Sequence, residues 1–151
     1  MNIVFKPTCD LYDEHLDVAR VPTVSLLNFG GERQFCGTVV TVKCFEDNSR
    51  IKELVAMEGK GKVMLVDGGG SQRCALVGDV LADEAQRRGW AGIIVYGSVR
   101  DKVALSKLGL GVMALGVTPR KSVRRGEGQT NIPIQIGNVW CESGDIVYGD
   151  D

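Results

Sequence analysis

Three polar residues in the middle of the chain have the types and spacing of a site for an anion and a metal ion. Asp79 follows Gly78 early in a helical pattern, and Arg100-Asp101 comes after twenty intervening residues, just beyond the apolar stretch 93–96. An arginine can hold a carboxylate through two parallel hydrogen bonds. Aspartate oxygens suit Mg²⁺, Mn²⁺ or Ca²⁺. The free N–H groups and positive dipole of a helix N-terminus near residues 77–81 would also favour a carboxylate or phosphate.

The same residues also permit a purely structural interpretation. Asp79 would then only complement the dipole of its own helix, and Arg100 would only form a surface ion pair. The spacing alone leaves both interpretations open. Placement favours the site, because Asp79 and Asp101 each follow one of two neighbouring predicted strands, and ligands collect beyond the carboxyl ends of such strands.

Three consecutive glycines, 68–70, separate a predicted strand over 62–67 from a predicted helix over 75–88. We expect this run to make a tight turn that frees the helix N-terminus to face an anion. The alternative is a connection that only lets the helix pack closely. A dinucleotide fingerprint is disfavoured because Arg73 stands where the third glycine should be, and no Gly-Lys-Ser/Thr follows to make a phosphate loop. The same lack of a fingerprint argues against a methyltransferase that uses S-adenosylmethionine.

Hydrophobic periodicity predicts an α/β fold with a central βαβαβ unit flanked by additional β-strands. The expected helices cover 9–16 (capped by Thr8), 51–57, 75–88 and 100–107. The expected strands cover 35–45, 62–67, 91–96, 112–116, an edge strand at 132–136, and short strands at 139–140 and 146–148. The inward residues of the two site helices are expected to be Leu76, Val77, Val80, Leu81 and Ala85, and then Val103, Ala104 and Leu108.

Length and composition indicate one ordinary globular domain over residues 1–151. A net charge of −1 argues against direct binding of nucleic acid or an anionic membrane. No apolar run has the length of a membrane span, and the N-terminus lacks the features of a signal peptide. Five cysteines without a CxxC pair, and a single histidine, His15, argue for reduced thiols and against zinc. We therefore expect a cytoplasmic protein.

The combined pattern resembles the family that contains the regulator of ribonuclease activity A and the 4-hydroxy-4-methyl-2-oxoglutarate aldolases. The matching stretches are 37–38, 43–48, 66–71, 73, 75–76, 78–79, 89–92, 96–101, 125–128 and 144–148. The resemblance implies a swivelling β/β/α-type domain and a homotrimer with sites near the subunit contacts. Enzymatic members are similar to this chain in having an Asp, twenty residues and then Arg-Asp.

Carried over by position, the resemblance assigns substrate binding to Gly78, Asp79, Val80, Leu81 and Arg100, a catalytic role to Asp79 and Arg100, and metal binding to Asp101. It implies a divalent metal cofactor, Mg²⁺ or Mn²⁺, and a small 2-oxo acid substrate. The expected reaction is class II aldol cleavage to two pyruvates, with oxaloacetate decarboxylation, and it needs no lysine Schiff base. Members usually continue beyond the equivalent of 149–151, so the general acid or base stays unassigned.

The alternative function is a non-enzymatic regulator that binds and inhibits a ribonuclease. The relevant feature is the basic run 120–125, which carries four arginines or lysines, of which Arg125 is the last. Short basic runs are usually exposed to solvent without further function. The run contains no aromatic residue for stacking on RNA bases, so a protein partner is favoured over RNA itself.

Overall fold

The computed structural model describes residues 2–151, and its centre is one mixed eight-stranded sheet. The order along the sheet is β1-β6-β5-β3-β2-β10, with β4 attached to β5 and β7 attached to β2. These strands are β1 (Leu27–Asn28), β2 (Phe35–Lys43), β3 (Lys62–Asp67), β4 (Ala75–Val77), β5 (Gly92–Val99), β6 (Gly111–Val117), β7 (Gln129–Thr130) and β10 (Ile146–Gly149). A separate hairpin pairs β8 (Ile134–Ile136) with β9 (Val139–Cys141).

The predicted parallel core is confirmed. Strands β2, β3, β5 and β6 run parallel to one another, while β1, β7 and β10 add antiparallel edges. The carboxyl ends of the parallel strands therefore meet at one edge of the sheet, the position at which open α/β sheets bind ligands.

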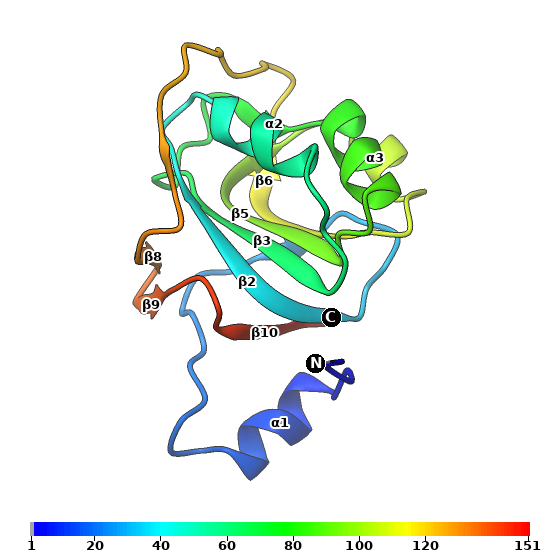
Figure 1. Cartoon of the computed structure of the whole chain (residues 1–151), viewed down its shortest axis with the longest axis vertical. Helices are drawn as coiled ribbons and strands as arrows, with labels where there is room; N and C mark the ends of the chain where they lie inside the picture. Colours follow the sequence, from blue (N-terminus) through cyan, green and yellow to red (C-terminus); the bar gives the residue numbers. More distant parts are fainter. Residues whose placement is uncertain (1) are drawn as a thin grey trace.

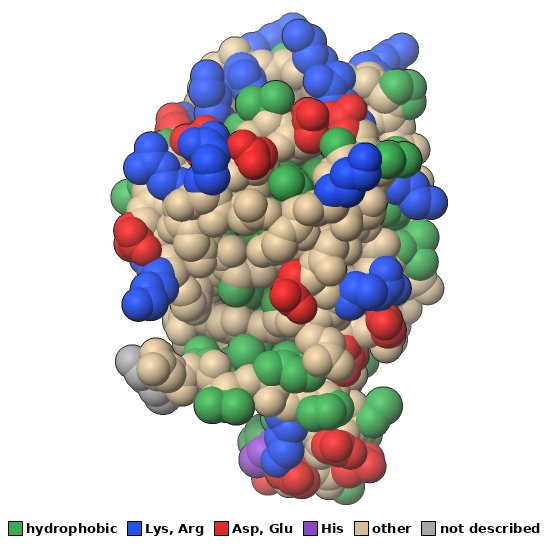
Figure 2. All heavy atoms as spheres, turned by 90° about the vertical axis from the view of Figure 1, so that its right-hand side faces the viewer, with side chains coloured by type: hydrophobic (Ala, Val, Ile, Leu, Met, Phe, Trp, Pro, Cys, Tyr) green, Lys and Arg blue, Asp and Glu red, His purple; other side chains and the backbone are tan. Residues whose placement is uncertain are grey.

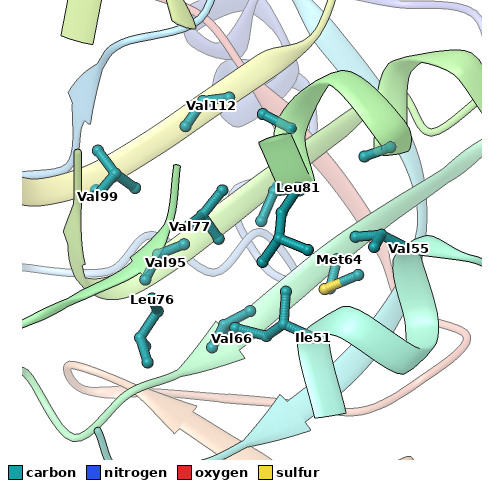
Figure 3. Close-up of a cluster of buried hydrophobic side chains, with 14 of the residues drawn as sticks. Ile51, Val55, Met64, Val66, Leu76, Val77, Leu81, Val95, Val99 and Val112 are labelled. Carbon is teal, nitrogen blue, oxygen red and sulfur yellow. The ribbon is translucent and has the colours of Figure 1, made fainter. Parts of the chain in front are cut away.

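Helices cover one face of this sheet, as Figure 1 shows for α2 and α3. They are α2 (Ser49–Val55), α3 (Asp79–Arg87) and the single turn α4 (Lys102–Leu105). Beneath them lies the larger apolar core, drawn in Figure 3, in which Ile51, Met64, Val66 and Val112 are fully buried. This burial is the main source of stability for such short helices, which would be marginal by themselves.

The opposite face is covered by the β8–β9 hairpin and by an N-terminal arm that carries α1 (Thr8–Glu14). Ile134 and Ile136 of the hairpin pack on Val39, Leu65 and Ile94. The hairpin, the sheet and the helices thus give the β/β/α layering that the resemblance implied. The helix α1 buries no residue, and Figure 1 shows it standing away from the sheet.

Several predicted boundaries are wrong. The residue that precedes α1 is Pro7, and the Thr8 hydroxyl donates to Asp150 Oδ1 (2.6 Å) instead of capping the helix. The predicted edge strand 132–136 is part of the separate hairpin. In α4, Val103 is 69% exposed and the buried residue is Leu105, because only one helical turn forms there.

The largest error concerns the predicted helix over 75–88. Its first three residues form β4, which pairs with β5, and the helix begins only at Asp79. Leu76 and Val77 are buried as strand residues. Since the helix begins four residues later than predicted, its phase differs, and Val80 points to solvent with 74% exposure. Gly78 is the turn between strand and helix, a role we had given to the three glycines.

Candidate functional site

The candidate site lies where β4 gives way to α3 and β5 gives way to α4. Gly78 connects β4 to α3, and Arg100-Asp101 connects β5 to α4. β4 and β5 are paired, with Val77 opposite Val99, so the two junctions are neighbours. The structure therefore brings together Gly78, Asp79, Arg100 and Asp101, which are distant in the sequence.

Asp101 is held in an unusual backbone conformation. Its φ of 61° and ψ of 45° are left-handed, a region that few non-glycine residues adopt. Its Oδ2 atom accepts a hydrogen bond from the backbone N–H of Asp79 (3.1 Å) and lies 3.7 Å from Arg100 Nε. No partner of Oδ1 occurs among the hydrogen bonds of residues 2–151, so one carboxylate oxygen stays available. Strain of this kind costs free energy and is concentrated at functional sites.

Arg100 lies across Gly78. A Cβ atom added to Gly78 would be 2.8 Å from Asp101 Oδ2 and 3.2 Å from both Cγ and Nε of Arg100. Only glycine leaves room for this close packing. Arg100 Nη1 also donates to the carbonyl of Pro119 (3.3 Å), and the side chain is 39% exposed. The guanidinium is thus oriented by the protein on one side and open to solvent on the other.

The start of α3 faces the same place. The first hydrogen bond of the helix runs from Ala82 N–H to Gly78 O, so the amides of Val80 and Leu81 precede it and have no acceptor within the helix. Val80 is exposed and Leu81 is 5% exposed, which leaves their backbone amides, and not their side chains, as possible ligands. The Asp79 side chain is exposed at the helix start.

The glycines 68–70 serve a different purpose from the one predicted. Gly68 N–H and Gly70 N–H both donate to the carbonyl of Tyr96, at 3.0 and 3.2 Å. Gly69 and Gly70 have φ values of 68° and 73°, which glycine adopts freely. The run therefore wraps the end of β5 and leads into β4. Its expected role in freeing a helix N-terminus was wrong, because no helix follows it directly.

A buried polar turn lies between β2 and α2. Asp47 is fully buried, and its carboxylate accepts from Ser49 N–H (2.8 Å), Ser49 Oγ (2.6 Å) and Arg125 N–H (2.7 Å). Burial opposes ionisation of Asp47, but these hydrogen bonds outweigh it, so its pKa lies below the ordinary value. The sequence signal was the Asp-x-Ser spacing, a pattern typical of side-chain hydrogen bonding to a turn.

Glu46, in the same turn, holds the glycine-rich loop. Its carboxylate accepts from Arg73 Nε and Nη2 (2.6 and 2.7 Å) and from Ser71 Oγ (2.6 Å). The hydrogen bond from Arg73 is the main reason that the pKa of Glu46 lies below its ordinary value. Two consecutive acids thus tie two different loops to the end of β2.

Comparison with known proteins decides the family. The pattern of the RraA-like family, described as Aldolase/RraA, matches residues 8–151. The chain belongs to the RraA-like family.

Curated RraA-like relatives carry the provisional name 4-hydroxy-4-methyl-2-oxoglutarate aldolase. A protein of Alcanivorax borkumensis is 54% identical over 145 residues, which is 95% of this chain and 91% of the relative. A protein of Pseudomonas syringae pv. tomato is 49% identical, over 95% of this chain and 89% of the relative.

Solved RraA-like structures share the fold under different titles. The RNA-processing inhibitor RraA from Thermus thermophilis has a TM-score of 0.92 at 39% identity, over 97% of this chain and 89% of its own. A structure from Geobacillus kaustophilus, titled S-adenosylmethionine:2-dimethylmenaquinone methyltransferase, has a TM-score of 0.94 at 41% identity, over 96% and 90%. Fold alone therefore does not separate the functions.

The donor set of this RraA-like site fits a hard divalent cation. Asp101 offers one unpaired carboxylate oxygen, and the exposed Asp79 side chain is close by. Mg²⁺ and Mn²⁺ are commonly bound through one or two carboxylates together with substrate oxygens and water. Residues 2–151 contain no group of three or more His, Cys, Asp or Glu that would enclose a metal by itself. A cation held here would therefore need further oxygen ligands, such as water, beyond those of Asp79 and Asp101.

Two hollows lie elsewhere on the RraA-like chain. A cavity of about 480 Å³ separates the N-terminal arm from the sheet, and its floor is Val39, Leu65, Ile94 and Met113. It is mainly apolar, and neither Arg100 nor Asp101 lines it, so we do not place the chemistry there. A more open hollow of about 610 Å³ lies beside Cys44 and Asp67. Burial, with Asp47 and Asp67 nearby, raises the pKa of the Cys44 thiol to about 12, so it is no nucleophile.

The described chain contains no membrane-spanning candidate, because none of its helices is both long enough and apolar enough. Charge is unevenly distributed over the surface. Figure 2 shows Lys and Arg side chains gathered at the upper end of the molecule, where Figure 1 places the loop over 118–128. This end of the molecule would therefore attract anions in general.

Proposed function

We propose that this RraA-like protein is a divalent-metal-dependent lyase. Its substrate would be 4-hydroxy-4-methyl-2-oxoglutarate, cleaved to two pyruvates, and it would also decarboxylate oxaloacetate. The observation that carries the proposal is the convergence of Arg100, Asp101 and the α3 N-terminus around Gly78. The names of the aldolase relatives at about 50% identity support it.

Arg100 and the helix amides would bind the carboxylate of the substrate. The free side of the guanidinium can donate two parallel hydrogen bonds, and the amides of Val80 and Leu81 add donors in a positive field. The Pro119 carbonyl restricts the rotation of Arg100, which reduces the entropy lost on binding. Together these groups would form an oriented anion site adjacent to the carboxylate of Asp101.

Both reactions pass through the same charge distribution. Breaking the bond between carbons 3 and 4 of the aldol leaves the electron pair on one pyruvate as an enolate. The 4-hydroxyl loses its proton as its carbon becomes the carbonyl of the second pyruvate. Loss of CO₂ from oxaloacetate leaves the same enolate, and protonation gives pyruvate. Arg100 and the α3 amides would help to stabilise this developing negative charge.

Asp101, with Asp79 beside it, would hold the cation, Mg²⁺ or Mn²⁺. When bound, such a cation supplies Lewis-acid stabilisation of the enolate oxygen. The left-handed backbone at Asp101 and the hydrogen bond from Asp79 N–H fix the carboxylate so that Oδ1 stays available. The role proposed for Asp101 is therefore to bind and orient.

The test is a pyruvate assay. The metal-free protein is supplied with 4-hydroxy-4-methyl-2-oxoglutarate or oxaloacetate, with and without Mg²⁺ or Mn²⁺, and pyruvate is measured through a coupled dehydrogenase. We expect two pyruvates for each aldol consumed, and loss of turnover on chelation. Turnover no higher than that of the metal alone would refute the proposal. Binding of S-adenosylmethionine by calorimetry tests the methyltransferase alternative in the same preparation.

We further propose that the protein works as a cytoplasmic homotrimer. Arg100 and Asp101 keep 39% and 36% of their side-chain surface exposed, so a neighbouring subunit has room to enclose the substrate. Light scattering coupled to gel filtration measures the assembly. A monomer that is fully active would contradict the need for a neighbour.

A regulator of a ribonuclease is the second candidate. The supporting observations are the exposed basic segment 120–125 and the 39% identity to the RNA-processing inhibitor. A pull-down with a purified ribonuclease, followed by an RNA-cleavage assay, would discriminate it from the lyase. Inhibition that persists in a variant without lyase activity would favour the regulator.

A further inference from the structure

The loop over 118–128 is attached along its length, although most of it is exposed. Ala75 N–H donates to Arg120 O (2.6 Å), and Ser122 N–H donates to Ala75 O (3.1 Å). Val123 forms a further pair of backbone hydrogen bonds, with Glu46 O (3.3 Å) and Asn48 N–H (3.2 Å). The loop therefore runs beside β4 and then beside the turn that follows β2.

Asp47 is the buried group on which the far end of this loop depends. Its Oδ2 accepts from the amides of Arg125 (2.7 Å) and Glu127 (3.4 Å), while Ser49 Oγ accepts from the Gly126 amide between them (2.9 Å). Asn48 Oδ1 accepts a hydrogen bond from Arg124 Nε (3.0 Å), and Asn48 Nδ2 donates one to the carbonyl of Leu76 (2.9 Å). One short turn thus contacts both the loop and β4.

The near end of the loop touches the candidate site. The Pro119 carbonyl accepts from Arg100 Nη1 (3.3 Å), and β4, which the loop flanks at Ala75, ends at Val77, directly before Gly78. Displacement of the loop would therefore remove the acceptor that orients the guanidinium and the backbone that supports Gly78. The path from Asp47 to Arg100 is continuous, because side-chain hydrogen bonds join Asp47 to the far end of the loop and Arg100 to Pro119 at its near end.

We propose that Asp47 is a positioning residue for Arg100, acting through the loop over 118–128. This inference rests on the proposed function, because it concerns the geometry of the same anion site. Asp47 itself does not reach the substrate. A carboxylate is required there because all its neighbours donate, and an asparagine would direct its own N–H₂ group at one of them.

The experiment compares Asp47→Asn with the matched change Asp145→Asn. Asp145 also accepts a backbone N–H, from Glu142 (2.9 Å), and forms an ion pair with Arg20, but it lines the cavity on the opposite face of the sheet. We expect kcat/KM with oxaloacetate to fall about tenfold or more in Asp47→Asn, the range found for residues that orient a ligand-binding group. Asp145→Asn should retain wild-type kcat/KM.

Two further measurements distinguish positioning from general damage. On an Arg100→Lys background, Asp47→Asn should cause little further loss, because both changes affect the same contact; additive losses would overturn the inference. Trypsin should cut after the arginines and the lysine of segment 120–125 about tenfold faster in Asp47→Asn, because the loop loses its anchor. A wild-type cutting rate with unchanged kcat/KM would also overturn it.

The outcomes separate this inference from the proposed function. A wild-type protein without turnover refutes both, whereas an active wild type with an equally active Asp47→Asn variant refutes the inference alone. If Asp47→Asn does not fold, Ser49→Ala replaces it, since that change removes the acceptor of Gly126 N–H and leaves the buried carboxylate in place. We then expect the same non-additivity with Arg100→Lys.

Discussion

Two ends of parallel strands at the same edge of the sheet carry aspartates with opposite properties. Asp47, just after β2, is buried, and both of its oxygens accept hydrogen bonds. Asp101, just after β5, is 36% exposed at its side chain, and only its Oδ2 has a partner. Both lie in turns that precede a helix, but one carboxylate is saturated and the other is not.

This difference in hydrogen bonding indicates which of the two aspartates can bind a ligand. A buried carboxylate that is fully hydrogen-bonded cannot accept a metal ion without breaking its turn, and so it acts by holding structure. A carboxylate with a free oxygen, on a strained backbone and beside an arginine, has unused binding capacity. Substitutions at the β2 end should therefore affect stability first, and substitutions at the β5 end should affect turnover first.

The largest effect is expected for Asp101→Ala. Turnover with Mg²⁺ should fall at least about a hundredfold, the range for loss of a charge-stabilising group in an active site. The free energy of urea unfolding should fall by only about 1–2 kcal/mol, because alanine adopts the left-handed conformation of Asp101 less readily than aspartate does and the hydrogen bond from Asp79 N–H is lost. The matched control is Asp83→Ala, which removes an exposed carboxylate of α3 that pairs with Arg87. If Asp101→Ala unfolds the protein instead, the contrast between the two strand ends is wrong.

Arg100→Lys is expected to have the next largest effect. Lysine keeps the charge but loses the planar fork, so it cannot hold a carboxylate through two parallel hydrogen bonds while also donating to Pro119. We expect KM to rise and kcat/KM to fall about ten- to a hundredfold. Arg87→Lys, on the outer surface of α3, serves as the control. Equal kinetics for the two variants would remove Arg100 from the site.

Gly78→Ala should act at the same strand end with a smaller effect. The new methyl group would stand 2.8 Å from Asp101 Oδ2 and 3.2 Å from Arg100 Nε, so both side chains must move outward. The φ of −125° at Gly78 is open to alanine, and the fold should be retained. We expect about a tenfold loss of kcat/KM. Gly109→Ala, where the nearest atom would be 3.7 Å away, should leave turnover unchanged.

Much of the sheet could be predicted because its strands have simple signals. The stretch 62–67 has an apolar centre, 63–66, and is bounded by glycines, and it forms β3 over the predicted residues. Leu76 and Val77 were misassigned because two apolar residues before a helix fit either period. What decided their state was pairing with β5, a long-range contact that no local pattern encodes.

The candidate site was predictable in its residues but not in its support. Asp79, Arg100 and Asp101 follow strands, so their meeting at one edge follows from parallel topology. The Pro119 carbonyl and the Asp47 turn could not be assigned to the site, since their contribution depends on the path of the loop over 118–128. That path is set by backbone hydrogen bonds such as Ala75 N–H to Arg120 O, which carry no side-chain signature.

The smallest predicted effect is the pH dependence of the stability that Asp47, at the β2 end, contributes to the fold. Because the pKa of Asp47 is lower in the folded protein than in the unfolded chain, its ionised form stabilises the fold fully above the ordinary aspartate value of about 3.9. This contribution is lost as the pH falls through the lower, folded-state pKa. In urea unfolding, Asp47→Asn should be less stable than the wild type by about 1–2 kcal/mol at pH 7, as expected for a hydrogen-bonded charge. This difference in the free energy of unfolding between the variant and the wild type should stay constant down to about pH 5 and should become smaller towards pH 3.

Gly109→Ala serves as the reference for this series, because it changes no titratable group. Its free energy of unfolding should therefore differ from that of the wild type by the same amount at every pH. The difference in the free energy of unfolding between Asp47→Asn and the wild type could instead grow in acid. That result would mean that the buried carboxylate carries a proton in the folded protein. It would then donate one hydrogen bond itself and compete with the N–H groups of the loop. The saturated acid at the β2 end would in that case be a proton-bearing group, and its contrast with Asp101 would rest on burial alone.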